Sequence, residues 1–335
     1  MANLPKIRRA SARASRQFTD AAPAPERVPD VQRLESHGLT WINIDSPRET
    51  EISWLAESYD FHELDIEDVR SRRRQRAKID EYDDYVFLVL HFPRFDKRTQ
   101  RLQAAELNVF ISKNLLITIP NESLKPISAM WSRCATRDED RERFMGKGSG
   151  YLLYELVDAM FDYCFPILDK IGFKLDALED EIFDGGGETI VRDISNAKQE
   201  IINYRKIIKP QRPTLRGLER QVKEYAPHDL EFYFDDIVDK NERIWDLLEN
   251  YKEVVEALEA TNESVITHRL NEIIRVLTIM SALVLPLTFI TGFYGMNIDG
   301  LVFSNHGGWS IVFVAGVMVG TAAGLIAWFR RKRWI

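Results

Sequence analysis

Residues 276–293 read VLTIMSALVLPLTFITGF, an uncharged stretch of about 18 residues, which is the length that crosses the hydrocarbon core of a bilayer. A second uncharged stretch of about 21 residues, WSIVFVAGVMVGTAAGLIAWF, occupies 309–329. Trp309 and Trp328 lie at or near its ends, where indole rings favour the membrane interface. Two transmembrane helices are therefore expected. The alternative is a buried hairpin of a soluble protein, which would need other segments to cover both helices on all sides.

Four basic residues follow the second stretch directly: Arg330, Arg331, Lys332 and Arg333. Cytoplasmic flanks of membrane helices carry an excess of Lys and Arg, so this basic ring is expected in the cytoplasm. Two spans then place both termini of a multi-pass protein on the cytoplasmic side of the inner (cytoplasmic) membrane. The connecting segment 295–308 would be external.

Small residues and a proline bear on how the spans pack. Gly316, Gly320 and Gly324 recur at four-residue spacing, a stripe that lets another helix approach closely, and we expect the second span to pack against the first. Pro286 in the first span lacks an amide donor, which a membrane helix tolerates with a local bend.

A long helix is expected to lead into the first span. Apart from Pro286, no strong helix breaker occurs between His228 and Gly292, and a helix of about 65 residues would be about 95 Å long. Its residues recur at three- and four-residue steps, typical of a coiled-coil seam, although the periodicity by itself favours ordinary helix packing. The seam positions are Ile237, Asn241, Ile244, Leu248, Tyr251, Val255, Leu258, Asn262 and Val265.

A stripe containing polar residues continues from the seam into the membrane. It consists of Asn271, Ile274, Leu277, Ser281, Leu285, Thr288 and Gly292. Polar groups at this depth need water or polar partners. One pair of helices cannot surround a water-filled path, so the stripe predicts several copies assembled around an axis, each lining a pore with this face.

The part of the chain before the long helix has mixed character. Short runs rich in β-branched and aromatic residues predict strands at 40–44, 86–92, 107–111 and 115–119, and helices are expected at 49–59 and 64–72. These elements predict an α/β sandwich. Later charged helices are separated by expected turns at 185–187 and 209–213.

The expected organisation follows from these segments. It comprises a disordered N-terminal tail (1–29), a cytosolic α/β domain (30–150), a cytosolic helical hairpin (151–227), a stalk helix (228–272), a pore-lining membrane helix (273–294), the external loop (295–308), a second membrane helix (309–329) and a basic cytosolic end (330–335).

Composition and motifs exclude several functions. The formal net charge of −7 argues against a nucleic-acid partner, and the basic run 70–76 is interpreted as a solvated segment beside the acidic run 80–84. Cys134 and Cys164 form no zinc-binding spacing, and the six histidines are scattered. No phosphate-binding Gly-rich loop, nucleophile elbow or His-Glu-x-x-His motif occurs. We expect neither an enzyme nor a cofactor.

Directly after the first span, Tyr294-Gly295-Met296-Asn297 resembles the signature of the CorA family of divalent-cation channels. The resemblance also covers PLTFI at 286–290, KIDEYDDYVFLVLHFP at 78–93 and ELNVFISKNLLITIP at 106–120, and it extends over most of the chain beyond residue 35. It implies a funnel-shaped homopentamer with an α+β cytosolic domain, a long stalk helix and a two-helix transmembrane hairpin. Its partners would be the lipid bilayer and divalent cations.

The resemblance also assigns roles to residues. Gly295, Met296 and Asn297 would form the external selectivity filter. The pore lining would be Asn271, Ile274, Leu277, Leu285, Thr288 and Gly292. Mg²⁺ gives up its waters reluctantly, so a neutral ring of Asn297 amides that binds its hydration shell suits this ion.

Intersubunit metal sites that stabilise a closed state are a further implication of the resemblance. The matching acidic positions are Asp96 and Asp236, for which ordinary solvated carboxylates are the alternative. A divalent cation would then be both substrate and regulator, and its loss would leave carboxylates that repel one another.

The external loop departs from the family pattern. Many magnesium-transporting members carry Met-Pro-Glu-Leu after the signature, whereas residues 298–306 here read IDGLVFSNH. His306 favours a softer ion such as Zn²⁺, as in the ZntB branch of the family. The leading interpretation is a channel for Mg²⁺, and for Co²⁺ or Ni²⁺ besides, with inward flow. The alternatives are a zinc transporter, proton-coupled or not, and a non-conducting membrane scaffold.

Overall fold

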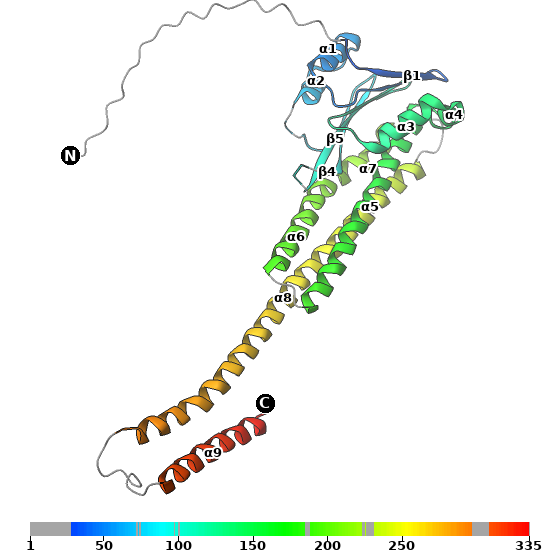
Figure 1. Ribbon diagram of the computed structural model, residues 1–335. Coiled ribbons are helices and arrows are strands. Elements are labelled where there is room, and N and C mark those ends of the chain that lie inside the picture. Colours follow the sequence, from blue (N-terminus) through cyan, green and yellow to red (C-terminus); the bar gives the residue numbers. More distant parts are fainter. Residues whose placement is uncertain are drawn as a thin grey trace, which may run out of the picture. The chain divides into compact units, whose positions relative to one another are not determined.

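A computed structural model describes residues 28–71, 73, 75–96, 98–99, 101–184, 188–222, 225, 231–296 and 308–334 (Figure 1). The chain divides into two compact units. The first takes its described residues from Met1–His91, Ala105–Ala159 and Pro213–Asp235, and the second from Phe92–Ala104, Met160–Arg212 and Asp236–Ile335.

A six-stranded mixed sheet is the centre of the first unit. Its strands are β1 (Gln32–Ser36), β2 (Leu39–Asn43), β3 (Lys78–Glu81), β4 (Val86–Asp96), β5 (Arg101–Ser112) and β6 (Leu115–Pro120), in the spatial order β1-β2-β6-β5-β4-β3. The β2 and β6 strands pair in parallel, with Trp41 opposite Leu116, whereas β5 and β6 are antiparallel, with Phe110 opposite Ile117. The four predicted strands are confirmed as β2, β4, β5 and β6.

Helices cover both faces of this sheet, which explains why its central strands are almost continuously apolar. Adjacent residues on a strand point to opposite faces. Ile42 joins Leu55 of α1 (Glu49–Ser58) and Ile66 of α2 (Glu63–Arg70) in one core. The neighbouring Trp41 packs edge-on against Trp131 of α3 (Lys125–Thr136), with the ring centroids 4.7 Å apart. The predicted α/β sandwich and its two helices α1 and α2 are confirmed.

The remaining helices are mostly long. They are α4 (Asp138–Met145), α5 (Ser149–Asp184), α6 (Glu188–Ile208), α7 (Arg212–Val222), α8 (Glu231–Tyr294) and α9 (Gly308–Arg331). The turn predicted at 209–213 is a short 3-10 segment at Lys209–Gln211, after which Pro213 already lies in the first turn of α7. The turn predicted at 185–187 lies outside the described residues.

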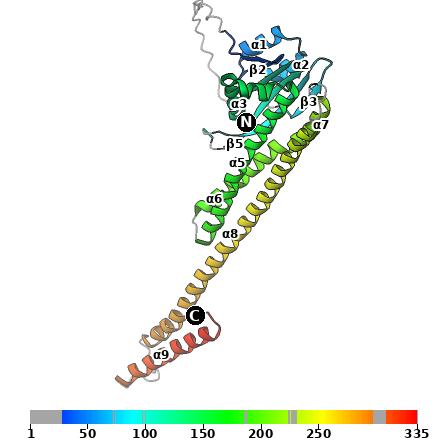
Figure 2. The same ribbon diagram turned by 90° about the vertical axis from the view of Figure 1, so that its right-hand side faces the viewer.

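The α8 helix is a single element of 64 residues, close to the predicted length. In the second unit it lies beside α6 and the later part of α5 (Figure 2). The predicted seam is its buried face: Ile237, Asn241, Ile244, Leu248, Val255, Leu258 and Asn262 are buried, and Tyr251 and Val265 are partly buried. Ordinary packing inside one chain therefore accounts for the seam.

Polar pairs on both sides of the seam hold α8 to its neighbours. Lys198 and Arg205 of α6 contact Glu259 and Glu249 of α8, at 2.6 Å and 2.7 Å. On α5, Gly172 allows a close approach of the two helices. A Cβ atom at this position would lie 2.8 Å from the Tyr251 hydroxyl and 3.3 Å from its Cζ.

We predict that Gly172→Ala destabilises the helical bundle by about 1–3 kcal/mol, because the added methyl group overpacks the contact with Tyr251. The apparent melting temperature of the purified chain, followed by circular dichroism, should fall. Tyr251→Phe in the Gly172→Ala background should recover part of the loss, because it removes the nearest atom. Gly217→Ala is the control, since its Cβ would meet only Ile79 at 3.7 Å. Equal effects of the two glycine substitutions would contradict the packing argument.

Candidate ion pathway on the long helix

Two described helices, α8 and α9, contain segments long and apolar enough to cross a membrane. Only 6% of the most apolar window of α8 is buried within the chain, and none of that of α9. The core helix of a soluble protein would instead be mostly buried. Because such an extent of apolar surface is unfavourable in water, lipid or further copies of the chain must cover it.

The membrane part of α8 has two different faces. Its partly or fully buried residues are Ile279, Ala282, Leu283, Pro286, Leu287 and Ile290, which share one face. In both views α9 runs alongside this part of the helix (Figures 1 and 2). The predicted stripe lies on roughly the opposite face, at about 100° per residue.

All predicted pore-lining residues are exposed in the single chain. They are Asn271, Ile274, Leu277, Leu285, Thr288 and Gly292, together with Ser281. Leu277 is 65% exposed and Leu285 is 71% exposed, although both are large apolar residues of the first span. The structure thus leaves the whole stripe free for contact with water or with other copies.

The threonines of the span are compatible with a helix in an apolar medium. The Thr288 hydroxyl donates to the Val284 carbonyl at 2.9 Å, and the Thr291 hydroxyl donates to the carbonyls of Leu287 at 3.1 Å and Thr288 at 3.0 Å. Each hydroxyl proton is therefore satisfied inside the helix. The oxygen lone pairs of Thr288 remain available as acceptors on the stripe.

A glycine is required where α8 ends. The Gly295 amide donates to the Thr291 carbonyl at 2.9 Å, and a Cβ atom on Gly295 would lie only 2.9 Å from the same oxygen. Met296 follows and is 55% exposed. Asn297, the third residue of the predicted selectivity filter, lies outside the described residues.

The second span packs against the first, but not through its glycine stripe. The covered residues of α9 are Val314, Met318, Thr321, Ala322, Leu325 and Phe329. Gly316, Gly320 and Gly324 are exposed, and a Cβ placed on any of them would have no atom within 4 Å from the described residues outside the nearby turns of α9 itself. Small residues at four-residue spacing permit close approach but do not identify the partner, so the glycine stripe faces lipid or another copy.

Basic residues complete the end of α9. Arg330, Arg331, Lys332 and Arg333 are all exposed, and cations at a helix C-terminus are favoured by its dipole. Arg333 adopts a left-handed conformation with φ of 56°, and its amide donates to the Arg330 carbonyl at 3.1 Å. This arrangement is a helix C-cap, so the four charges are held together at one end.

The two predicted regulatory carboxylates have local partners in the single chain. Asp96 at the end of β4 accepts from the Arg98 amide at 3.0 Å and from the Thr99 hydroxyl at 2.8 Å, and these hydrogen bonds lower the pKa of its carboxyl group. Asp236 on α8 lies 3.6 Å from Lys240. Within the described part of the chain, no three His, Cys, Asp or Glu residues gather into a metal site.

Comparisons with known proteins give a consistent picture. A model of the family described as CorA-like Mg²⁺ transporter protein matches residues 36–331. The cobalt/magnesium transport protein CorA of Thermotoga maritima is 30% identical over 302 residues, which cover 90% of this chain and 85% of that protein.

Solved structures share the fold. The CorA magnesium transporter from Methanocaldococcus jannaschii matches with a TM-score of 0.78 at 22% identity, over 90% of this chain and 93% of that one. The ZntB cytoplasmic domain from Vibrio parahaemolyticus matches with a TM-score of 0.56 at 15% identity, over 70% of this chain and 88% of that one. The predicted order of structural elements, an α/β domain followed by a long helix and two apolar C-terminal helices, is confirmed.

We predict that copies of the chain meet along the stripe of α8. Leu277→Cys should give a ladder of covalently linked chains when membranes are treated with a bifunctional maleimide. Leu283→Cys, about 240° further round the helix, should remain monomeric on a denaturing gel. Cys134 and Cys164 are buried, which raises their thiol pKa values to about 11 and about 12, so they should add little background. Linkage from Leu283→Cys alone would reverse the assignment of the two faces.

Proposed function

The chain belongs to the CorA-like Mg²⁺ transporter family, and from this premise we propose that it forms a homopentameric channel that carries Mg²⁺ into the cytoplasm. Membership makes it a divalent-cation transporter of the membrane, not an enzyme. The single observation that carries the proposal is the exposed stripe of α8, which has polar groups at membrane depth and no cover within the chain.

Assembly of several copies around an axis would give the polar groups of this stripe both water and protection from lipid. The α9 helix covers the opposite face of α8, so only other copies can shield the stripe from lipid while leaving it wetted. Cyclic symmetry then brings one stripe from each copy to a common path. The proposed number of five copies rests on the family resemblance.

A neutral filter supports Mg²⁺ as the carried ion. Gly295 ends α8 with little steric cost, and Asn297 would present its amide oxygen just beyond this end. A ring of amide oxygens can bind the water shell of Mg²⁺ without removing it, which a tight carboxylate cage would not do. Co²⁺ or Ni²⁺ would be carried as hydrated ions by the same path.

The membrane potential is the proposed driving force. Two charges that move inward gain about 4.6 kcal/mol per 100 mV when the inside is negative. This proposal agrees with cytoplasmic termini, because the four basic residues at the end of α9 favour the cytoplasmic side. The expected direction of Mg²⁺ flow is therefore inward.

Zinc transport is the second candidate function. His306 in the external loop is the observation that favours it, since imidazole suits Zn²⁺ better than Mg²⁺. The likeness to the ZntB domain is one of fold, at 15% identity. A scaffold that conducts no ion is the third candidate, and it predicts no flux of either metal.

We predict that Asn297→Ala reduces Mg²⁺ uptake to the level of protein-free liposomes. The purified chain would be reconstituted with a potassium-set potential, negative inside, and entry of Mg²⁺ and Zn²⁺ would be measured in parallel. The wild-type chain should take up Mg²⁺ at a rate that rises with the potential. Asn305→Ala, another asparagine of the same loop, is the control and should retain uptake.

Two results would reject the magnesium proposal, and a third would reject only the assignment of Asn297 to the filter. Zn²⁺ entry with little Mg²⁺ entry would favour the zinc branch. Entry of neither ion would favour the scaffold. Full Mg²⁺ uptake by Asn297→Ala would remove this amide from the filter.

Regulation by internal Mg²⁺ is proposed to use Asp96 and Asp236. The Asp96 carboxyl group has a lowered pKa, so it stays ionised and able to attract a cation well below neutral pH. We predict that the double variant Asp96→Asn, Asp236→Asn keeps taking up Mg²⁺ when the liposome interior already holds millimolar Mg²⁺. Uptake by the wild-type chain should fall under that condition.

The substitutions in this test are chosen to preserve structure. Asn at position 96 keeps one oxygen that can accept from the Arg98 amide, and its NH₂ group can donate to the Thr99 hydroxyl oxygen in place of the second carboxylate oxygen. Asp239→Asn, on an exposed residue of the same helix as Asp236, is the control and should behave as wild type. If internal Mg²⁺ inhibits the double variant as strongly as the wild-type chain, the two carboxylates are ordinary solvated groups without a regulatory role.

A further inference from the structure

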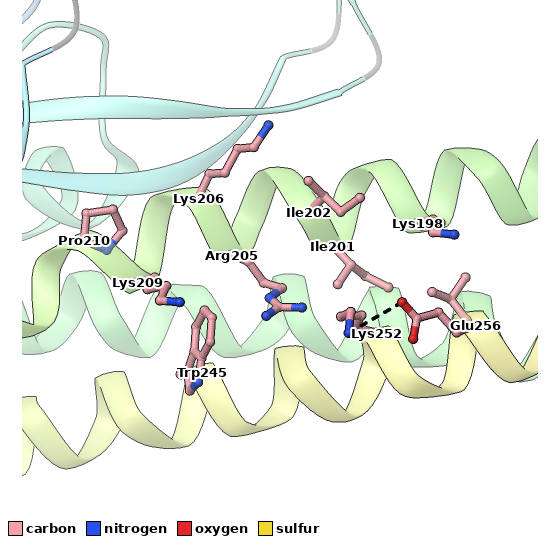
Figure 3. A pocket seen from close by; sticks show the side chains of 11 residues that line it. Lys198, Ile201, Ile202, Arg205, Lys206, Lys209, Pro210, Trp245, Lys252 and Glu256 are labelled. Atoms are coloured by element: carbon pink, nitrogen blue, oxygen red, sulfur yellow. Dashed lines mark ion pairs between the residues drawn. The ribbon is translucent and has the colours of Figure 1, made fainter.

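A cavity of about 430 Å³ opens between α6 and α8 in the second unit (Figure 3). This volume lies in the range of pockets for small organic ligands. It is more basic than the chain as a whole, since five of its lining residues are Lys or Arg and one, Glu256, is acidic. The chain itself has a net charge of −7. Three of these cations already have carboxylate partners, Lys198 with Glu259, Arg205 with Glu249 and Lys252 with Glu256, so the attraction for an anion is centred on Lys209.

The charged residues of the cavity keep donors free for a ligand. Arg205 pairs with Glu249 and Lys252 lies 3.5 Å from Glu256, but a guanidinium has five N–H donors and an ammonium has three. Lys209 is exposed, and its ammonium lies 5.2 Å from the Trp245 ring centre. Among the described residues, no carboxylate lies within ion-pair distance of Lys209.

The same cavity has a flat, apolar part. Arg205 lies over the Trp245 ring, with the guanidinium carbon 4.8 Å from the ring centre. Ile201 and Val255 add aliphatic surface beside it. Indole rings and guanidinium planes both stack on the flat faces of bases. Figure 3 shows Arg205 and Lys209 on the α6 side and Trp245 on the α8 side.

From this combination we propose that the cavity binds a nucleoside phosphate, with the base against Trp245 and the phosphates at Lys209 and Arg205. The cavity contains none of the residues of the proposed ion pathway, and the proposal for this cavity does not depend on ion transport. The N-terminal residues are an unsuitable occupant, because Arg8, Arg9 and Arg13 would be repelled by the cations of the cavity. A ligand in this cavity would contact both α6 and α8, so its binding would stabilise the packing of these two helices.

The test is calorimetric titration of ATP into the purified full-length chain in detergent, with EDTA present so that metal complexes do not form. Saturable binding of ATP is expected, and thermal stability should rise with ATP because the ligand binds the folded state. Lys209→Glu should weaken ATP binding about tenfold or more, because a charge-assisted contact is replaced by repulsion.

Matched variants and ligands make the result specific. Lys170→Glu, at an exposed lysine of α5 outside the cavity lining, should change the affinity by less than about twofold. Tripolyphosphate lacks the base and adenosine lacks the phosphates, so each should bind about tenfold more weakly than ATP or worse. Trp245→Leu should weaken ATP and leave tripolyphosphate unchanged.

Four outcomes would overturn the proposal. These are no saturable binding of ATP at millimolar concentration, equal binding by Lys209→Glu and wild type, tripolyphosphate binding as tight as ATP, and adenosine binding as tight as ATP. If ATP does not bind and Lys209→Glu also separates the copies on size exclusion, the cavity is a subunit contact instead. Ion flux is not measured in this experiment, so its result is independent of the transport proposal.

Discussion

Polar groups at membrane depth must be kept from lipid, and one chain can cover only one face of a helix. The α9 helix packs against one face of the membrane part of α8 and leaves the opposite face, which carries Ser281 and Thr288, without cover. Hydrocarbon offers no hydrogen-bond donor to the oxygen lone pairs that remain on these hydroxyl groups, whereas water between copies that meet along this face would offer one. In the proposed assembly, oligomerisation and a wetted path would thus be two results of one physical requirement.

The part of α8 before the membrane obeys a different requirement. There the helix is packed by its own chain, through a buried seam that ends near Asn262 and through pairs such as Arg205 with Glu249. Close approach is possible because Gly172 presents no side chain to Tyr251. One continuous helix therefore belongs to a water-exposed bundle at one end and to a lipid-exposed hairpin at the other.

The periodic spacing of apolar residues made much of the fold predictable from the sequence. The central strands, the 64-residue helix and both spans show strong hydrophobic patterns, and each is present in the structure. The strands β1 and β3 were not predicted, because sequences such as QRLES have too few apolar residues to signal a strand and depend on pairing with a neighbour. The face through which α9 packs and the basic cavity depend on which side chains meet across helices. Residues such as Lys209 and Trp245 are distant in sequence, so no local sequence pattern predicts their contact.

Residues 266–278 of α8, which follow the buried seam and reach into the first span, are exposed along their whole length in the single chain. This segment of about 13 residues is about 20 Å long. It acts as a lever, since a tilt of about 5° at one end moves the other end by about 2 Å. In the proposed assembly each subunit would have one such segment, and a movement of the bundle would reach the proposed ion path along it. The stiffness of this segment, more than the affinity of any ligand for the bundle or the ion path, would then limit how closely movements of the bundle and of the ion path are coupled.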